Sequence, residues 1–170
     1  HLKVAPIVAR NQSFWCAVKG CQGHRHKLSQ YCLSHYQRTQ RHGDPLAVPV
    51  RVLAWKAYTA KVEALLSANK DHPGIHQAVQ FIDSWMSGAA ANPHEAAWAS
   101  EVALLKTHGV SALQVITQLA ACWTYIHENP RACRSDSHRA FTLSKAVLSL
   151  APRPRKYSRA ANAILDSGGK

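Results

Sequence analysis

Cysteine and histidine gather in one short stretch near the start of the chain, CAVKGCQGHRHKLSQYCLSHYQRTQRH at residues 16 to 42. Four residues separate Cys16 from Cys21, two separate Cys32 from His35, and ten lie between the two pairs. Two closely spaced ligand pairs joined by a loop are typical of a structural Zn²⁺ site, in which four protein ligands form a tetrahedron. Such a site has no open position for an activated water, so we expect the metal to stabilise the fold and not to catalyse a reaction.

Ordinary buried thiols are the alternative, but three of the five cysteines and four of the eleven histidines fall within these 27 positions. This clustering is unlike the use of cysteine in a hydrophobic core. His35 has the spacing to Cys32 that one helical turn supports, although His24, His26 and His42 are alternatives for the fourth ligand. The odd number of cysteines argues against a disulfide framework and indicates a reducing compartment, the cytoplasm.

The same stretch resembles a known zinc-binding module. Three runs carry the resemblance, C-A-V-K-G-C, Y-C-L-S-H-Y-Q-R and R-H-G-D-P, within residues 14 to 46. Modules of this kind recur in proteins of bacteriophages and bacterial mobile elements, often beside HNH-type homing endonucleases. The resemblance implies that Cys16, Cys21, Cys32 and His35 are the zinc ligands and that the helix after Cys32 presents a basic surface to nucleic acid. It covers about a fifth of the chain and says little about the rest.

Positive charge is concentrated at the two ends of the chain. Residues 1 to 60 contain nine lysines and arginines against one acidic residue, residues 61 to 130 three against six, and residues 131 to 170 nine against two. Basic ends around a mildly acidic middle indicate DNA or RNA as a partner, because neutralising phosphates releases counterions. The side chains that we expect to contact phosphates are Lys19, Arg25, Lys27, Arg38, Arg41, Arg153, Arg155, Lys156 and Arg159.

Helical periodicity dominates the chain after residue 50, where apolar residues recur every three to four positions between Gly, Pro and N-cap signals. The pattern predicts helices over residues 50 to 69, 75 to 88, 93 to 107, 112 to 127, 135 to 150 and 157 to 166. The second ligand pair predicts one more helix before them, over residues 28 to 42. Strand patterns are nearly absent. The sequence therefore predicts an all-α protein with two parts: an N-terminal zinc module over residues 1 to 46, and a helical domain of about five to six helices over residues 50 to 170.

Details within these parts are also predicted. We expect residues 1 to 13 to be extended or partly disordered. Phe14 and Trp15 are expected to cap the small core of the module, and stacking on bases is the alternative. Asn92 followed by Pro93 predicts a helix start. On the helix over residues 112 to 127, the side chains expected to be buried are Leu113, Ile116, Leu119, Ala120, Trp123 and Ile126.

Two other DNA-related functions find weaker support in the sequence. An HNH nuclease needs a histidine base, a metal ligand and an asparagine on a hairpin before a helix, and no hairpin pattern surrounds the nearest candidates, Asp71, His72, His76 and Asp83. A glycine between two helices, here Gly109, is also found in helix-turn-helix motifs, in which Gln114, Thr117 and Gln118 could reach bases. That second helix, however, has no lysine or arginine between residues 111 and 127.

We therefore expect a zinc-stabilised, non-enzymatic nucleic-acid-binding protein of a phage or mobile element, with no catalytic residues and no small-molecule substrate. The alternative is an interaction or inhibitor protein whose helical domain binds a host or phage protein, and an HNH-related nuclease comes third. No run of 18 apolar residues occurs, so no membrane span is predicted.

Overall fold

The structure, a computed structural model, describes residues 4 to 94 and 98 to 151 of the chain. Its elements are α1 (Val4–Gln12), α2 (Leu33–His42), the short 3-10 helix η1 (Val52–Ala54), α3 (Lys56–Ala68), α4 (Pro73–Ala91), α5 (Ala99–Thr107), α6 (Ala112–Glu128) and α7 (Asp136–Leu148). Among the described residues there is no strand, only an isolated antiparallel bridge between Trp15 and His24. The predicted all-α fold is confirmed.

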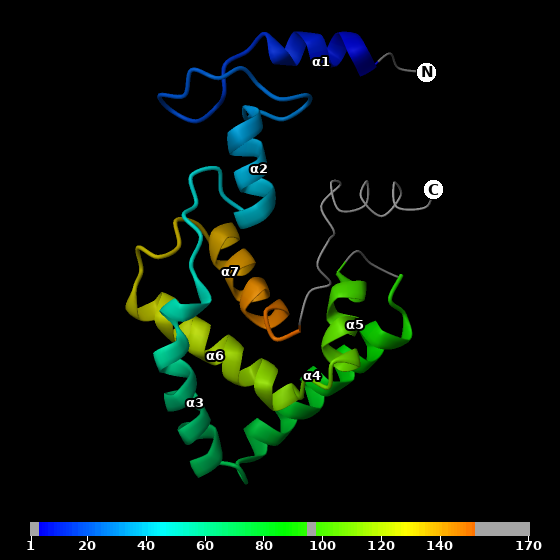
Figure 1. Cartoon of the computed structure of the whole chain (residues 1–170), viewed down its shortest axis with the longest axis vertical. Helices are drawn as coiled ribbons and strands as arrows, with labels where there is room; N and C mark the ends of the chain where they lie inside the picture. The colour runs from blue at the N-terminus through cyan, green and yellow to red at the C-terminus, as the bar shows by residue number, and fades with distance from the viewer. Residues whose placement is uncertain (1–3, 95–97, 152–170) are drawn as a thin grey trace, which may run out of the picture.

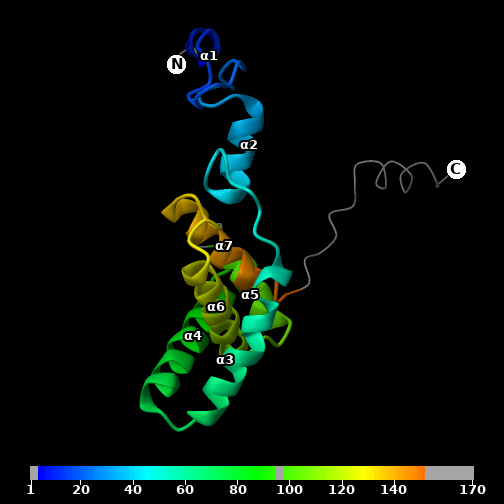
Figure 2. The same ribbon diagram turned by 90° about the vertical axis from the view of Figure 1, so that its left-hand side faces the viewer.

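The described part of the chain is elongated. Figures 1 and 2 show α1 and the loops after it at one end, α2 leading away from them, and α3 to α7 forming the body at the other end. The module meets the helical domain where the end of α2 packs on α7, with His42 Nδ1 lying 2.8 Å from Lys145 Nζ. The loops that carry the cysteines therefore project away from the body.

Two buried clusters hold the body together, and both include residues of α6 and α7. One joins α4, α5, α6 and α7 through Met86, Leu105, Val115 and Val147, among other buried residues. The other surrounds Trp55, which is 1% exposed and whose indole Nε1 donates to Gln118 Oε1 at 3.0 Å. Because neither cluster includes a residue of the module, we expect the body to stay folded when the module is perturbed.

Several helix ends follow the predicted signals. Ser111 forms a capping box with Gln114 at the start of α6, and Ser135 accepts a hydrogen bond from the His138 N–H at the start of α7. Helix α4 begins at Pro73, two residues before the predicted start, because His72 acts as its N-cap and accepts from the Gly74 N–H. The helix predicted over residues 157 to 166 lies outside the described residues.

Other predicted boundaries are wrong, and the helix predicted from residue 50 begins only at residue 56 as α3, after η1. Residues 4 to 12 are helical and not extended, because Pro6 falls in the first turn, where its missing N–H costs nothing, and the Asn11 side chain bonds to the loop between Cys21 and Cys32. Helix α2 begins at residue 33 and not at 28, since residues 26 to 31 form a hydrogen-bonded turn before Cys32. The alanines after Gly88 extend α4 to residue 91, so Asn92 ends that helix, and α5 begins only at residue 99.

The buried face of α6 also differs from the prediction. Of the residues expected inside, Ile126 is buried, but Leu113 and Trp123 are 46% and 52% exposed. The residues that α6 buries are Ala112, Val115, Thr117, Ala121, Cys122 and Ile126. Helix α6 packs against α3, α4 and α7 on different sides, so periodicity predicts the helix but not which of its faces each neighbour covers.

Gly43 offers a test of the contact between α2 and α7. It ends α2 with φ of 75°, and a Cβ there would lie 2.6 Å from the Ser137 backbone oxygen and 2.7 Å from a ring carbon of Phe141. Gly109 has φ of 69° and no neighbouring atom within 4 Å. We expect Gly109→Ala to cost about 1–2 kcal/mol of unfolding free energy through backbone strain alone. Gly43→Ala should cost about 1–3 kcal/mol more, because overpacking adds to the strain.

Urea unfolding of both variants checks this prediction, since both carry the same substitution at similar φ. Equal reductions in stability at the two positions would mean that the close approach of α2 to α7 adds nothing to the destabilisation caused by Gly43→Ala.

Candidate metal centre

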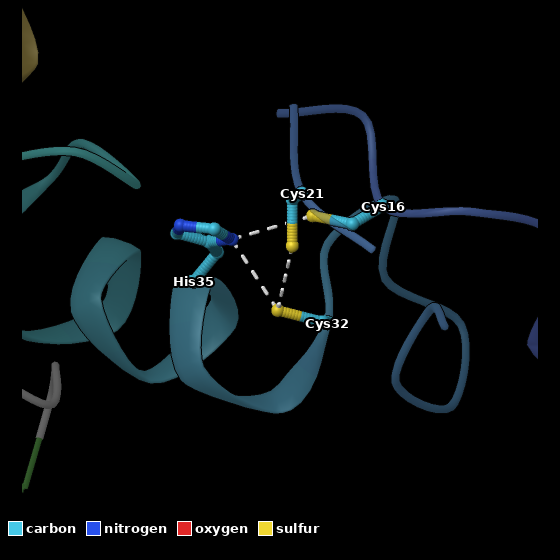
Figure 3. Close-up of side chains that lie close together, drawn as sticks. All are labelled: Cys16, Cys21, Cys32 and His35. Carbon is cyan, nitrogen blue, oxygen red and sulfur yellow. Dashed lines mark hydrogen bonds between the residues drawn. The ribbon is translucent and has the colours of Figure 1, made fainter. Parts of the chain in front are cut away.

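Four side chains from three local structures converge beside the start of α2. Cys16 lies in the loop after α1, Cys21 follows a tight turn, and Cys32 and His35 lie at the N-cap and in the first turn of α2. Figure 3 shows the three sulfur atoms and one ring nitrogen of His35 directed toward a common centre. The four ligand atoms all lie within 4.8 Å of one another.

The separations fit a tetrahedral metal site. His35 Nδ1 lies 3.4 Å from Cys16 Sγ and 3.3 Å from Cys32 Sγ, and the sulfurs of Cys21 and Cys32 are 3.8 Å apart. A regular tetrahedron built with Zn–S bonds of about 2.3 Å and Zn–N bonds of about 2.0–2.1 Å has edges of about 3.8 Å between sulfurs and about 3.5 Å between sulfur and nitrogen. The four residues therefore lie close enough together to bind one four-coordinate metal ion.

Two glycines shape the loops that carry the cysteines, Gly20 between Cys16 and Cys21 and Gly23 between Cys21 and Cys32. Gly20 has φ of 80° in the turn where the Cys21 N–H donates to Val18 O at 3.0 Å, a backbone conformation that favours glycine. The Gly23 N–H donates to Cys21 Sγ at 3.4 Å, and a Cβ at Gly23 would lie 2.9 Å from the Cys32 Cβ. A larger residue at position 23 would push the two halves of the site apart.

The thiols influence one another's ionisation. Burial raises the pKa of Cys16, but hydrogen bonds from backbone N–H groups and from the His35 side chain lower it to about 6. The Gly23 N–H lowers the pKa of Cys21, but burial and the thiols of Cys32 and Cys16 raise it above its ordinary value. Three thiolates this close repel one another, and a metal cation at their centre would remove that repulsion.

The alternative histidines lie in other contacts. The His24 ring stacks on Trp15 with centroids 4.4 Å apart, and His26 packs against Tyr36 at 5.4 Å. His42 is at the far end of α2, against Lys145. The structure thus places His35 beside the three cysteines.

The other two cysteines lie in the helical domain, and no disulfide forms among the five. Cys122 is buried in α6, where burial raises its pKa to about 12, and Cys133 donates to Thr142 Oγ1 at 3.7 Å. Both thiols are part of the packed core.

The side chains predicted to contact phosphates fall into three groups by their place in the structure. Lys19, Lys27, Arg38 and Arg41 are exposed on the module. Arg25 is half-buried, and its guanidinium donates to Trp15 O at 3.0 Å and to Asn11 Oδ1 at 3.4 Å, so it also joins α1 to the loop. The remaining four, Arg153, Arg155, Lys156 and Arg159, lie outside the described residues.

Five of the residues named for a nuclease or a helix-turn-helix make contacts within the fold. His72 caps α4, and Asp83 pairs with Lys106 at 2.7 Å. On α6, Gln114 completes the capping box, Gln118 binds Trp55, and Thr117 is buried and donates to the Leu113 carbonyl.

Phe14 and Trp15 do not cap a core, because they are 48% and 60% exposed. The alternative for these two residues, stacking on bases, requires exposed rings, and their exposure is compatible with it.

Comparison of the chain with protein-family models, with curated proteins and with solved structures gives no match. Within the residues described, none of the helices is both long and apolar enough to cross a membrane.

Proposed function

We propose that the N-terminal module binds one structural Zn²⁺ through Cys16, Cys21, Cys32 and His35, and that the module so stabilised binds DNA or RNA through its basic surface. Thiolates and imidazole are the ligands that zinc prefers, and four of them close the site. The proposal gives the metal a structural role and assigns no catalytic residue, as expected of a non-enzymatic protein of a phage or mobile element.

The charge of the module is the observation that carries the nucleic-acid part of the proposal. Residues 1 to 43 contain seven lysines and arginines and no acidic residue; Asp44 is the first acid in the chain. Three thiolates on Zn²⁺ would add a net charge of about −1, which leaves the module strongly positive. A module with this net positive charge attracts the phosphates of a nucleic acid.

Positive charge also extends to the junction between the module and α7. Burial lowers the pKa of His42, and the nearby positive charges of Lys145, Arg41 and Arg38 lower it further. These side chains belong to α2 and α7, so the basic surface continues from the metal site to the body. We propose that the basic stretch over residues 153 to 159, which lies outside the described residues, also binds phosphates.

Binding measured over a series of salt concentrations tests the proposal. Labelled DNA and RNA oligonucleotides should bind the zinc-loaded chain at low salt, and log K should fall linearly with log salt. The slope should be about −3 to −4 if the four exposed cations Lys19, Lys27, Arg38 and Arg41 each neutralise one phosphate. Absence of binding to either nucleic acid at about 50 mM salt would reject the proposed function.

A protein-binding role of the helical domain is the second candidate, and an apolar groove favours it. The groove runs between α4, α6 and α7, with adjoining cavities of about 440 and 460 Å³ that share Phe81, Ile82, Leu119 and Leu143. Phe81 is 71% exposed there, and an amphipathic partner helix with apolar residues three and four apart would fit such a groove. Binding at a mainly apolar interface would depend little on salt, so the salt series separates the two functions.

A further inference from the structure

The exposed indole of Trp15 is held flat beside the metal site. Trp15 and His24 form the isolated antiparallel bridge, which sets their side chains on the same side of the two paired segments. The two rings stack with centroids 4.4 Å apart and planes at 21°. His24 thus supports the indole from one side, while 60% of Trp15 stays exposed.

The backbone of Trp15 is fixed as well. Its carbonyl accepts from Arg25 Nε, the Arg25 N–H donates to Phe14 O at 3.0 Å, and the Cys16 N–H donates to Gly23 O at 2.9 Å. Since Cys16 is one of the four clustered residues, the metal site and these bonds hold the indole on a rigid base. A rigid aromatic surface loses little entropy when a flat ligand stacks on it.

The surroundings of the indole select for a phosphate-bearing ligand. Arg25 is bonded to Trp15, its guanidinium lies 5.3 Å from the Phe14 ring centroid, and no acidic residue occurs in the first 43 positions. A flat aromatic ring beside positive charge matches one chemical class, the bases and backbone of a nucleic-acid strand.

We infer that Trp15, supported by His24, is a stacking site for an unpaired base, so that the module binds single-stranded nucleic acid more tightly than duplex. This inference rests on the proposed function and names its substrate class. Bases in a duplex are paired and stacked, and their faces are closed to a side chain, whereas every base of a single strand can stack on an indole. A duplex can therefore bind only to the basic side chains of the module.

The test compares a labelled oligo(dT) strand of about 15 nucleotides with a duplex of the same length, using the full zinc-loaded chain. Stacking on one aromatic residue is worth about 1–3 kcal/mol, so Trp15→Ala should weaken single-strand binding by about fivefold or more and leave duplex binding unchanged. Trp15→Phe keeps a ring and should retain most of the affinity. Trp123→Ala removes a tryptophan of similar exposure from α6 and should change neither affinity.

Fluorescence supplies a second readout that does not depend on how Trp15→Ala folds. Adding oligo(dT) should quench tryptophan emission of the wild type, and Trp15→Phe, with its zinc intact, should lose that quenching. Suppose that the wild type binds nucleic acid, and that Trp15→Ala weakens single-strand and duplex binding equally or changes neither affinity. The stacking inference is then wrong and the proposed function stands. If the wild type binds neither form, both are wrong, and binding to lipid vesicles or to a protein would then explain the exposed ring.

Discussion

Cys32→Ser should release the metal and unfold the N-terminal module while helices α3 to α7 remain folded. Cys32 Sγ lies 3.3 Å from His35 Nδ1 and 3.8 Å from Cys21 Sγ, so its loss removes one corner of the tetrahedron. A serine hydroxyl is not deprotonated at neutral pH and does not replace a thiolate. Structural zinc contributes about 10–16 kcal/mol of apparent binding free energy in small zinc-finger peptides, far more than the module can gain from its few buried side chains.

Zinc content per chain measures whether the metal is bound. Limited proteolysis reports on the folding of the module, and circular dichroism on the helices of the body. The variant should lose its bound zinc, be cleaved within residues 14 to 46, and keep most of its helical signal. His24→Ala is the matched control, because His24 belongs to the same stretch but lies outside the cluster; it should retain one zinc. Full zinc content in Cys32→Ser would contradict the assignment of the ligands.

Replacing Arg38 and Arg41 together by alanine should reduce both the affinity for nucleic acid and its dependence on salt. The two arginines are exposed and three positions apart on α2, so they lie close together on the helix surface. Removing one cation that binds a phosphate should make the slope of log K against log salt shallower by about one unit. With about 1 kcal/mol per charge pair in a water-like dielectric, the double variant should bind about ten- to thirtyfold more weakly at moderate salt.

A charge-matched control is Lys61→Ala with Lys70→Ala. Lys61 lies in α3 and Lys70 just after it, and Figure 1 shows α3 running away from α1 toward the far end of the body. Their replacement removes the same net charge and should leave the slope unchanged. An equal effect of both double variants would mean that only total charge matters, and the α2 surface would then not be a binding site. Arg153→Ala with Arg155→Ala in the same assay measures the contribution of the C-terminal basic stretch.

The metal cluster was predictable because its determinants are local. Cys16 and Cys21 are joined by one tight turn, and Cys32 and His35 by one helical turn, so their spacing largely sets their geometry. The caps Ser111 and Ser135 were predictable for the same reason. Each of these features depends on residues within about one turn of the chain.

Features that depend on distant residues were mispredicted. Helix α1 is anchored by Asn11, whose side chain donates to the carbonyls of Lys27 and Ser29, 16 and 18 positions away. The orientation of α6 depends on three neighbouring helices, which is why Trp123 is outside. Trp15 is exposed because the module has almost no interior to receive it. None of these features is encoded in local spacing.

Withdrawal and return of zinc, with nucleic-acid affinity as the readout, tests the central claim most directly. The chain as purified should contain one zinc, bind an oligonucleotide at low salt, lose binding as a chelator removes the metal, and recover it when one equivalent of Zn²⁺ is added back. Binding that persists unchanged after the metal is removed, or freshly purified protein that contains no zinc, would contradict the account.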